Sequence, residues 1–331
     1  MGHVVVTGAS GFIGSSVVRQ LMAQGRDVLA VIEPGADLKN LEGLNVERVT
    51  ADVTDGARME RACSGAEALY HLAAIYRIWL PDPEVIYRVN LEGTTTVLLA
   101  AQKARVRRIV YTSSIAAVGL HGDGTPSDEN VKFNLHHIAN PYILTKYLSE
   151  RIAMQFARSG LPVVVVNPAF PFGERDRAPT PTGRVLLDIV RGKLPGLMPG
   201  GFNAVDVENV AKGHLRAEEK GRSGERYILG DHNISFEDFA RLVAKLGGVT
   251  ISERRIPTPL ILGLSWMAEQ IADRWTHKSP PTTYRTMQYA VRKAYFDVTR
   301  ARTELGLEST PLEQTIARAI EWYRDNGFLQ Q

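Results

Sequence analysis

Short apolar runs alternate with amphipathic stretches along the first half of the chain. The runs fall at residues 4–7, 28–32, 46–51, 68–72, 109–112 and 163–167 and consist largely of Val, Ile, Leu and Ala. Runs of this length and composition are typical of parallel strands that helices cover on both faces. Helical patterns fill intervening segments at residues 12–24, 59–62, 91–104 and 142–159. The alternation predicts an α/β fold with a Rossmann-type, doubly wound parallel sheet.

The pattern changes after Pro168, where Pro and Gly become frequent and strand-like runs become sparse. Helical patterns continue at residues 183–191, 236–246, 260–272 and 312–326. We therefore expect a dinucleotide-binding domain over residues 1–173 and a smaller, mixed α/β substrate lobe. The lobe would comprise residues 174–203 and 231–331. Residues 204–230 would return to the first domain, because 205–217 and 227–229 again resemble its elements.

Composition narrows the class of protein. The 331 residues carry a net charge of only +3, and basic clusters such as 105–108 lack interleaved aromatic residues, so we expect no nucleic-acid partner. The single cysteine, Cys63, excludes an internal disulfide. The longest apolar stretch, 259–272, is interrupted by Ser265 and Glu269 and is too short for a transmembrane segment. With no signal-peptide pattern before the first strand, we expect a cytoplasmic protein.

A glycine loop follows the first predicted strand. Gly8, Gly11 and Gly14 are spaced so that the backbone can turn tightly, approach a pyrophosphate and open a helix whose N-terminus faces it. Such a triplet can also be a plain strand-to-helix turn. Its position between a strand and a helix favours dinucleotide binding.

Two acidic residues follow the next strands. Glu33 lies 19 residues beyond Gly14, where a carboxylate can accept hydrogen bonds from the adenosine ribose and would repel a 2′-phosphate. It therefore favours NAD, with NADP as the alternative if Glu33 points to solvent and Lys39 or Arg48 meets a phosphate. Asp52 is placed to contact the adenine, or else caps a turn.

A tyrosine and a lysine four residues apart are the candidate reaction centre. Asn140 and Pro141 are typical of a helix start, and they place Tyr142 and Lys146 on one face of the helix that follows. The cation would lower the pKa of the phenol. Ser114, at the end of an upstream strand, could hydrogen-bond a carbonyl oxygen that Tyr142 protonates.

These features together resemble the extended short-chain dehydrogenase/reductase superfamily, also called the NAD-dependent epimerase/dehydratase family. Over essentially the whole chain, the sequence is similar to its dihydroflavonol-4-reductase-like branch, which includes hopanoid-associated sugar epimerases. The runs at 71–79, 110–114, 167–168, 179–183 and 224–230 carry that likeness. Relatives in this branch often have arginine where Glu33 stands, and this departure again favours NAD.

The resemblance implies roles for individual residues. Ser114 would polarise the carbonyl, and it is preferred over Ser113 because it lies five residues before Gly119. Tyr142 would be the general acid/base and Lys146 its partner, which also holds the cofactor. The remaining cofactor contacts would come from Gly8, Ser10, Gly11, Phe12, Ile13, Gly14, Glu33, Asp52, Val53, Leu72, Ala73, Ala74, Asn90 and Pro168.

The substrate is less well defined by sequence. Tyr76, Trp79 and Phe170 are candidate substrate contacts, and residues 256–266 add apolar side chains near the expected pocket. Arginines at 175, 177 and 184 and Lys193 could grip a nucleotide diphosphate, but they form no motif. His136 and His137 lack the partners of a metal site, so no metal is expected.

Three functions compete at this stage. The first is a reductase or dehydrogenase that moves hydride between NAD(P) and a carbonyl or alcohol carbon of a largely apolar small molecule. The second is a nucleotide-sugar epimerase that retains its NAD. The third is a non-catalytic dinucleotide sensor. Such a protein would not require Ser114, Tyr142 and Lys146, so their presence argues against it. The resemblance also implies a homodimer that packs through the helices at 91–104 and 142–159.

Overall fold

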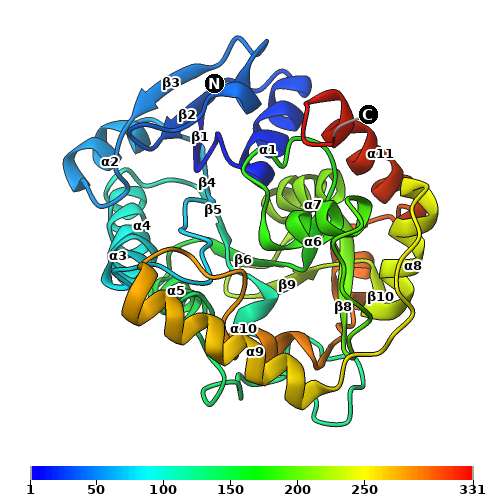
Figure 1. The fold of residues 1–331 in the computed structure, drawn as a ribbon. Helices are drawn as coiled ribbons and strands as arrows, with labels where there is room; N and C mark the ends of the chain where they lie inside the picture. The colour runs from blue at the N-terminus through cyan, green and yellow to red at the C-terminus, as the bar shows by residue number, and fades with distance from the viewer. Residues whose placement is uncertain (1, 330–331) are drawn as a thin grey trace.

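Seven parallel strands form the central sheet (Figure 1). The computed structural model describes residues 2–329. The strand order is β3-β2-β1-β4-β5-β6-β9, and the order reverses direction between β1 and β4. This confirms the predicted doubly wound sheet. The strands are β1 (Val4–Thr7), β2 (Val28–Ile32), β3 (Glu47–Thr50), β4 (Ala68–His71), β5 (Arg108–Thr112), β6 (Val163–Pro168) and β9 (Arg226–Leu229).

Helices cover both faces of this sheet, as the apolar strands require. Val4 and Val6 point into one core, which α1 (Phe12–Ala23) and α7 (Val207–Lys220) close. Val5 points into the other core, beneath the helices α2 (Gly56–Cys63), α4 (Thr94–Lys103) and α5 (Pro141–Arg158). The edge strand β3 differs from expectation, because all four of its residues are exposed. Its polar side chains suit an edge that meets solvent on one side.

A second, smaller sheet completes the mixed lobe. β8 (Gly201–Asp206) pairs in parallel with β7 (Phe170–Phe172) and β11 (Lys293–Ala294), and antiparallel with β10 (His232–Ser235). Its core lies against α6 (Pro181–Val190), α8 (Phe236–Gly247) and α11 (Leu312–Asp325). The sequence did not reveal these strands, because they are short and contain proline, glycine and asparagine.

The segment expected to return to the first domain divides between the two sheets. β9 extends the central sheet beside β6, and α7 packs on its face. Residues 201–206, by contrast, form the central strand of the small sheet.

The remaining elements are short, apart from one helix. α9 (Thr258–Ile271) runs along the lower edge of Figure 1, continues as η4 (Ala272–Thr276) and neighbours α10 (Tyr284–Ala290). None of the helices within residues 2–329 is both long and apolar enough to cross a bilayer. The other segments are α3 (Glu84–Tyr87), η1 (Lys39–Leu41), the π-helical η2 (Arg88–Gly93), η3 (Ile115–Ala117) and η5 (Ala301–Leu305).

Candidate active site

The glycine loop lies where the strand order reverses, between β1 and β4. Gly8 has a φ of +66°, and a Cβ there would stand 2.8 Å from the backbone nitrogen of Ala73. A Cβ on Gly14 would stand 2.0 Å from the carbonyl oxygen of Gly8. Both positions therefore exclude any side chain. Gly11 caps α1 without a side-chain hydrogen bond, so the first N–H groups of the helix are available to an anion. The cradle fits a dinucleotide pyrophosphate.

A chain of buried hydrogen bonds holds the turn that faces this loop. The Thr7 hydroxyl accepts from the N–H groups of Leu72 and Ala73, each at 3.2 Å. Its own proton therefore goes to Nδ1 of His71, 2.8 Å away. Nε2 of His71 then donates to the Thr94 hydroxyl at 3.2 Å. Burial, and next the charge of Lys146, lower the His71 pKa to about 3, so the ring is neutral.

Asn90 lies in the π-helical segment η2 and holds the next stretch of the same loop. Its Oδ1 accepts from the Ile75 N–H at 2.8 Å. Its Nδ2 donates to the Ile75 carbonyl at 3.2 Å and to the Thr145 hydroxyl at 3.0 Å. This amide therefore ties residue 75 to α5, a contact that the sequence did not reveal. Its expected contact with the cofactor stays a prediction.

Tyr142 and Lys146 lie on one face of α5, which begins as predicted. The Asn140 side chain accepts from the Ile143 N–H at 2.9 Å, and Pro141 occupies the first turn. The Lys146 side chain is buried, and its Nζ donates to the Thr112 carbonyl at the end of β5, 2.9 Å away. The lysine is thus anchored to the strand that leads to Ser114.

Ser114, rather than Ser113, contacts the tyrosine. Burial raises the pKa of Tyr142 to about 12, and a hydrogen bond with the Ser114 side chain opposes that rise. The Ser114 hydroxyl also accepts from the Ala116 N–H at 3.1 Å. Ser113 is buried and its hydroxyl has no partner within residues 2–329. The structure therefore brings together the three residues expected at the reaction centre.

The electrostatics of this centre differ from the sequence expectation. Lys146 was expected to lower the pKa of Tyr142, yet burial dominates and the pKa rises. Burial also lowers the pKa of Lys146 to about 8, against the attraction of Glu150. The sequence argument was wrong in sign because it counted the neighbouring cation and could not count desolvation.

A buried hydrogen-bond network around Glu150 reaches the backbone of Ser114, and sequence analysis missed it. One Glu150 carboxylate oxygen accepts from Arg226 of β9 at 2.8 Å. The other accepts from the Asn167 side-chain amide at 2.6 Å. The same Asn167 nitrogen donates to the Ser114 carbonyl at 2.9 Å. Glu150 lies one turn beyond Lys146, but its partners are distant in sequence and no local signal announces them.

Two tyrosines are neighbours of Tyr142. The Tyr76 ring lies 4.5 Å from that of Tyr142, centre to centre, and is tilted by 41°. Tyr289 comes from α10, far along the chain, and packs, as Tyr142 does, against the small buried cluster that contains Ile143. Its hydroxyl is buried without a partner within residues 2–329. Burial, and then the neighbouring Tyr142, raise the Tyr289 pKa. Tyr289 is a site residue that sequence analysis did not identify.

The other expected substrate residues, Trp79 and Phe170, contact other parts of the protein, and their contact with a substrate stays a prediction. Trp79 donates its indole N–H to Asp273 at 2.7 Å, which ties the loop after β4 to η4. Phe170 packs on Phe202 of the small sheet, with ring centres 5.2 Å apart. In the stretch 256–266, Trp266 is exposed rather than turned toward a pocket. Of the three candidates, Tyr76 alone neighbours Tyr142 in the described contacts.

The expected cofactor residues end their strands at the same edge of the sheet. Glu33 directly follows β2 and is exposed, and Pro168 is the buried last residue of β6. Asp52 accepts from the Thr54 N–H at 2.9 Å and from its hydroxyl at 2.8 Å, which is the turn alternative. Both of these hydrogen bonds use Oδ1, so the turn leaves Oδ2 of Asp52 available to contact an adenine.

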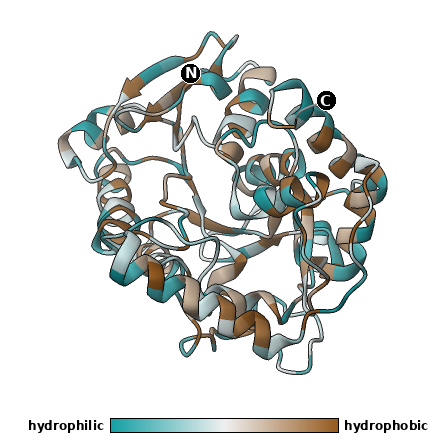
Figure 2. Ribbon diagram, in the orientation of Figure 1, coloured by the Kyte–Doolittle hydropathy of each residue, from teal (hydrophilic) through white to brown (hydrophobic). Residues whose placement is uncertain are grey.

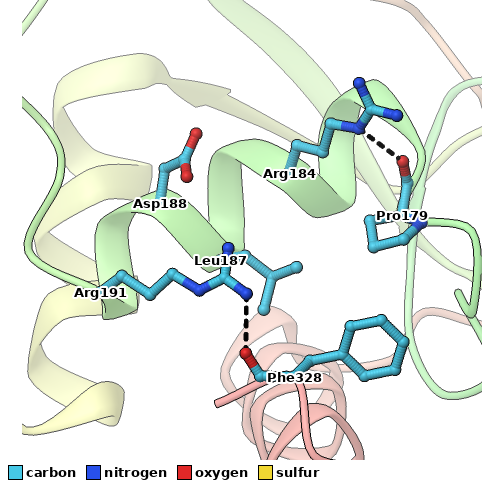
Figure 3. A pocket seen from close by; sticks show the side chains of 6 residues that line it. All are labelled: Pro179, Arg184, Leu187, Asp188, Arg191 and Phe328. Atoms are coloured by element: carbon cyan, nitrogen blue, oxygen red, sulfur yellow. Dashed lines mark hydrogen bonds between the residues drawn. The ribbon is translucent and has the colours of Figure 1, made fainter. Parts of the chain in front are cut away.

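The arginines considered for a sugar nucleotide are engaged by the protein. Arg175 pairs with Glu174 at 2.9 Å and also with Glu208. Figure 3 shows a hollow beside α6 in which Arg184 donates to the Pro179 carbonyl at 3.0 Å. None of the residues that line this hollow belongs to the candidate site. No group of potential metal ligands occurs within residues 2–329.

The fold is a Rossmann-like α/β fold, and its candidate site combines a glycine loop with the residues Ser114, Tyr142 and Lys146. Residues 4–230 match the profile of the NAD dependent epimerase/dehydratase family, and the chain belongs to this family. The resemblance seen in the sequence is thereby confirmed. The family and its relatives act on carbonyl and alcohol groups, so the chain is an NAD-dependent oxidoreductase.

Full-length relatives are similar to the chain. A Synechocystis sp. protein provisionally named a dihydroflavonol 4-reductase is 35% identical, over 98% of this chain and 95% of its own length. The sterol demethylase protein B of Methylococcus capsulatus is 33% identical, over 98% and 99%. The crystal structure of a nucleoside-diphosphate-sugar epimerase from Pseudomonas aeruginosa is 30% identical, with a TM-score of 0.83 over 99% of both chains.

Proposed function

We propose that this enzyme reduces an aldehyde or ketone, or oxidises the corresponding alcohol, on a largely apolar small molecule. The observation that carries the proposal is the placement of Ser114 near enough to Tyr142 to oppose the rise in its pKa, beside the buried Lys146 on the same helix. A hydroxyl pair of this kind can hold a carbonyl oxygen from two sides. When bound, the nicotinamide of the cofactor supplies or accepts the hydride.

Each residue of the set has a distinct task in this proposal. Ser114 donates a hydrogen bond to the carbonyl oxygen, which positions and polarises the substrate. Tyr142 transfers its phenolic proton to that oxygen in reduction and takes it back in oxidation. Lys146, fixed on the Thr112 carbonyl at 2.9 Å, contacts the cofactor ribose and favours the tyrosinate as it forms.

The cofactor proposal rests on the glycine cradle and on Glu33. The cradle around Gly8 and Gly14 excludes side chains and leaves helix N–H groups to the pyrophosphate. Glu33, exposed at the end of β2, would accept from the ribose hydroxyls and repel a 2′-phosphate. We therefore propose NAD as the preferred cofactor, with NADP used less well.

An apolar substrate follows from the surroundings of Tyr142. Tyr76 and Tyr289 provide ring faces, and the free Tyr289 hydroxyl supplies one polar contact. Arg175 and Arg184, which a nucleotide diphosphate would need, are engaged with carboxylates and a backbone carbonyl. The epimerase nevertheless remains the second candidate, because the 30% identical structure carries that name.

Net cofactor turnover distinguishes the two candidates. The purified enzyme should consume NADH with members of a panel of aromatic and aliphatic aldehydes and ketones. An epimerase would instead interconvert nucleotide sugars with no net change in NADH. The reductase proposal fails if no carbonyl compound consumes cofactor while nucleotide sugars are interconverted.

We further propose that the enzyme is a homodimer packed through α4 and α5. Val97 and Leu98 of α4 are buried in the core beneath the helix, so they are not available to a partner. Leu99 of α4 is half exposed and is the apolar side chain that a partner could cover. Analytical ultracentrifugation of wild type and Leu99→Asp tests this, since a dimer through α4 should dissociate in the variant.

A further inference from the structure

Exposed apolar side chains concentrate on one helix of the molecule. Of the ten large hydrophobic residues exposed within residues 2–329, six lie on α9 and η4. Figure 2 shows this helix as a series of brown bands at the lower edge of the view. We call the following set the α9 face: Leu260, Leu264, Trp266, Met267, Ile271 and Trp275. Clusters of this kind on a protein surface mark interaction sites.

The amphipathic pattern of α9 is inverted. Its polar residues turn toward the protein: Ser265 is buried and Glu269 accepts from the Tyr284 N–H at 2.8 Å. Leu260, Leu264 and Ile271 turn outward at helical spacing and share one side, whereas Ile261 and Leu262 are half-buried. Packing against the rest of the chain therefore does not explain why these residues are apolar.

Cations flank the α9 face at both ends. Arg254 precedes the helix, and Arg274 and Lys278 follow it, all three exposed. No carboxylate within residues 2–329 pairs with any of them. Asp273, the acid at this end, accepts the indole N–H of Trp79 at 2.7 Å. The patch thus combines an apolar centre with a positive rim.

Two tryptophans add to this pattern. Trp266 is half exposed, and Trp275 is 80% exposed at the C-terminal end of the apolar stripe. Indole rings favour the boundary between water and lipid, because they join a large apolar surface to one polar N–H. An outward tryptophan beside Arg274 and Lys278 suits an anionic, partly apolar surface.

We propose that the α9 face docks on the surface of a membrane that contains anionic lipids. The helix lies in the plane of the interface with its apolar side among the acyl chains, and the cations meet lipid phosphates. A second copy of the chain is a poorer occupant, because a two-fold contact would bring like charges together. The proposal is independent of the reaction that the enzyme catalyses.

Vesicle flotation with the full-length protein tests the proposal. The protein should float with vesicles of phosphatidylcholine and phosphatidylglycerol, and far less with phosphatidylcholine alone. Tryptophan emission should shift to shorter wavelength in the same samples. Arg274→Gln with Lys278→Gln should weaken partition onto the anionic vesicles by about fivefold for each cation lost.

Variants of the apolar face give the decisive comparison. Leu264→Gln and Ile271→Gln should each lower partition by roughly tenfold or more, since each removes an aliphatic side chain from the lipid. Leu38→Gln is the matched control, because Leu38 is also exposed but immediately precedes η1 rather than lying on α9 or η4. Circular dichroism checks that every variant is folded.

Either of two results overturns the proposal. The first is equal flotation of Leu264→Gln, Ile271→Gln and wild type, which would show that any vesicle binding uses another surface. The second is no binding to anionic vesicles. If sedimentation then shows that Leu264→Gln dissociates an oligomer, the α9 face contacts a second copy of the chain instead.

Discussion

Nζ of Lys146 lies 2.9 Å from the carbonyl oxygen of Thr112, inside the protein and at the end of the strand that leads to Ser114. This hydrogen bond joins α5, which carries Tyr142 and Lys146, to β5, which leads to Ser114. The contact fixes the lysine in space, and burial holds its pKa well below the usual value. Both properties can be tested by substitution.

The first prediction concerns the proton donor. Tyr142→Phe should lower turnover by about 10² or more, because the phenol that transfers a proton is lost. The dissociation constant for NADH, measured by fluorescence titration, should change little. Tyr147→Phe is the matched control, since Tyr147 lies on the same helix and stacks on Phe133. Turnover of Tyr142→Phe close to wild type would exclude the proposed role.

The second prediction concerns the pH dependence of stability. Burial lowers the Lys146 pKa from 10.5, the value of the free side chain, to about 8 in the folded protein. Below pH 8 the Lys146 side chain is protonated in both the folded and the unfolded state. Between pH 8 and 10.5 the unfolded state binds more protons than the folded state, so the wild type gains stability as the pH rises. Relative to Lys146→Met, that gain should approach about 3 kcal/mol.

Urea unfolding of both proteins from neutral pH to pH 10 measures this difference. Lys103→Met serves as the control, because Lys103 is exposed at the end of α4. Its stability should follow the wild-type curve in parallel. If the Lys146→Met and wild-type curves are parallel too, Lys146 does not titrate abnormally in the folded state.

The third prediction concerns cofactor choice. Glu33→Arg should shift the ratio of kcat/KM values toward NADPH, because a guanidinium at the end of β2 can pair with a 2′-phosphate that the carboxylate repels. Glu42→Arg makes the same change of charge at an exposed site outside the strand end. An NADH to NADPH ratio that is the same in both variants would place Glu33 away from the ribose.

The fourth prediction concerns the glycine cradle. Gly14→Ala should abolish measurable NADH binding and lower the free energy of unfolding, because its Cβ would overlap the Gly8 carbonyl oxygen at 2.0 Å. Gly263→Ala, on the open side of α9, meets nothing within 4 Å and should stabilise the helix by about 1 kcal/mol. Isothermal titration and urea unfolding measure both quantities. Wild-type NADH affinity in Gly14→Ala would contradict the proposed cradle.

Sequence reasoning succeeded where the relevant information is local. The glycine spacing, the Asn140–Pro141 helix start and the four-residue interval from Tyr142 to Lys146 all depend on neighbours along the chain. The apolar runs of the central sheet are equally local, and they gave its strands to within about a residue or two. The strands of the small sheet were not predicted, since β11 has only two residues and β7 contains Pro171.

Contacts between distant segments could not be read in this way. Thr7 meets His71 across 64 positions, Glu150 meets Arg226 across 76, and Tyr289 reaches Tyr142 from α10. The pKa of Tyr142 was misjudged for the same reason, because burial is a property of the assembled fold. The outward turn of Trp266 also escaped notice, because a helix pattern does not say which side meets the protein.

Tyr289 lies 59 positions beyond the last residue that matches the family profile, which ends at residue 230. In the proposed enzyme, the reaction chemistry is therefore encoded in one part of the chain and a wall of the substrate site in another. Substitutions in the last third of the sequence would then change which substrate the site accepts without altering the proton donor, Tyr142. Such a division of labour would let natural variation, or a protein engineer, exchange substrates while retaining the catalyst.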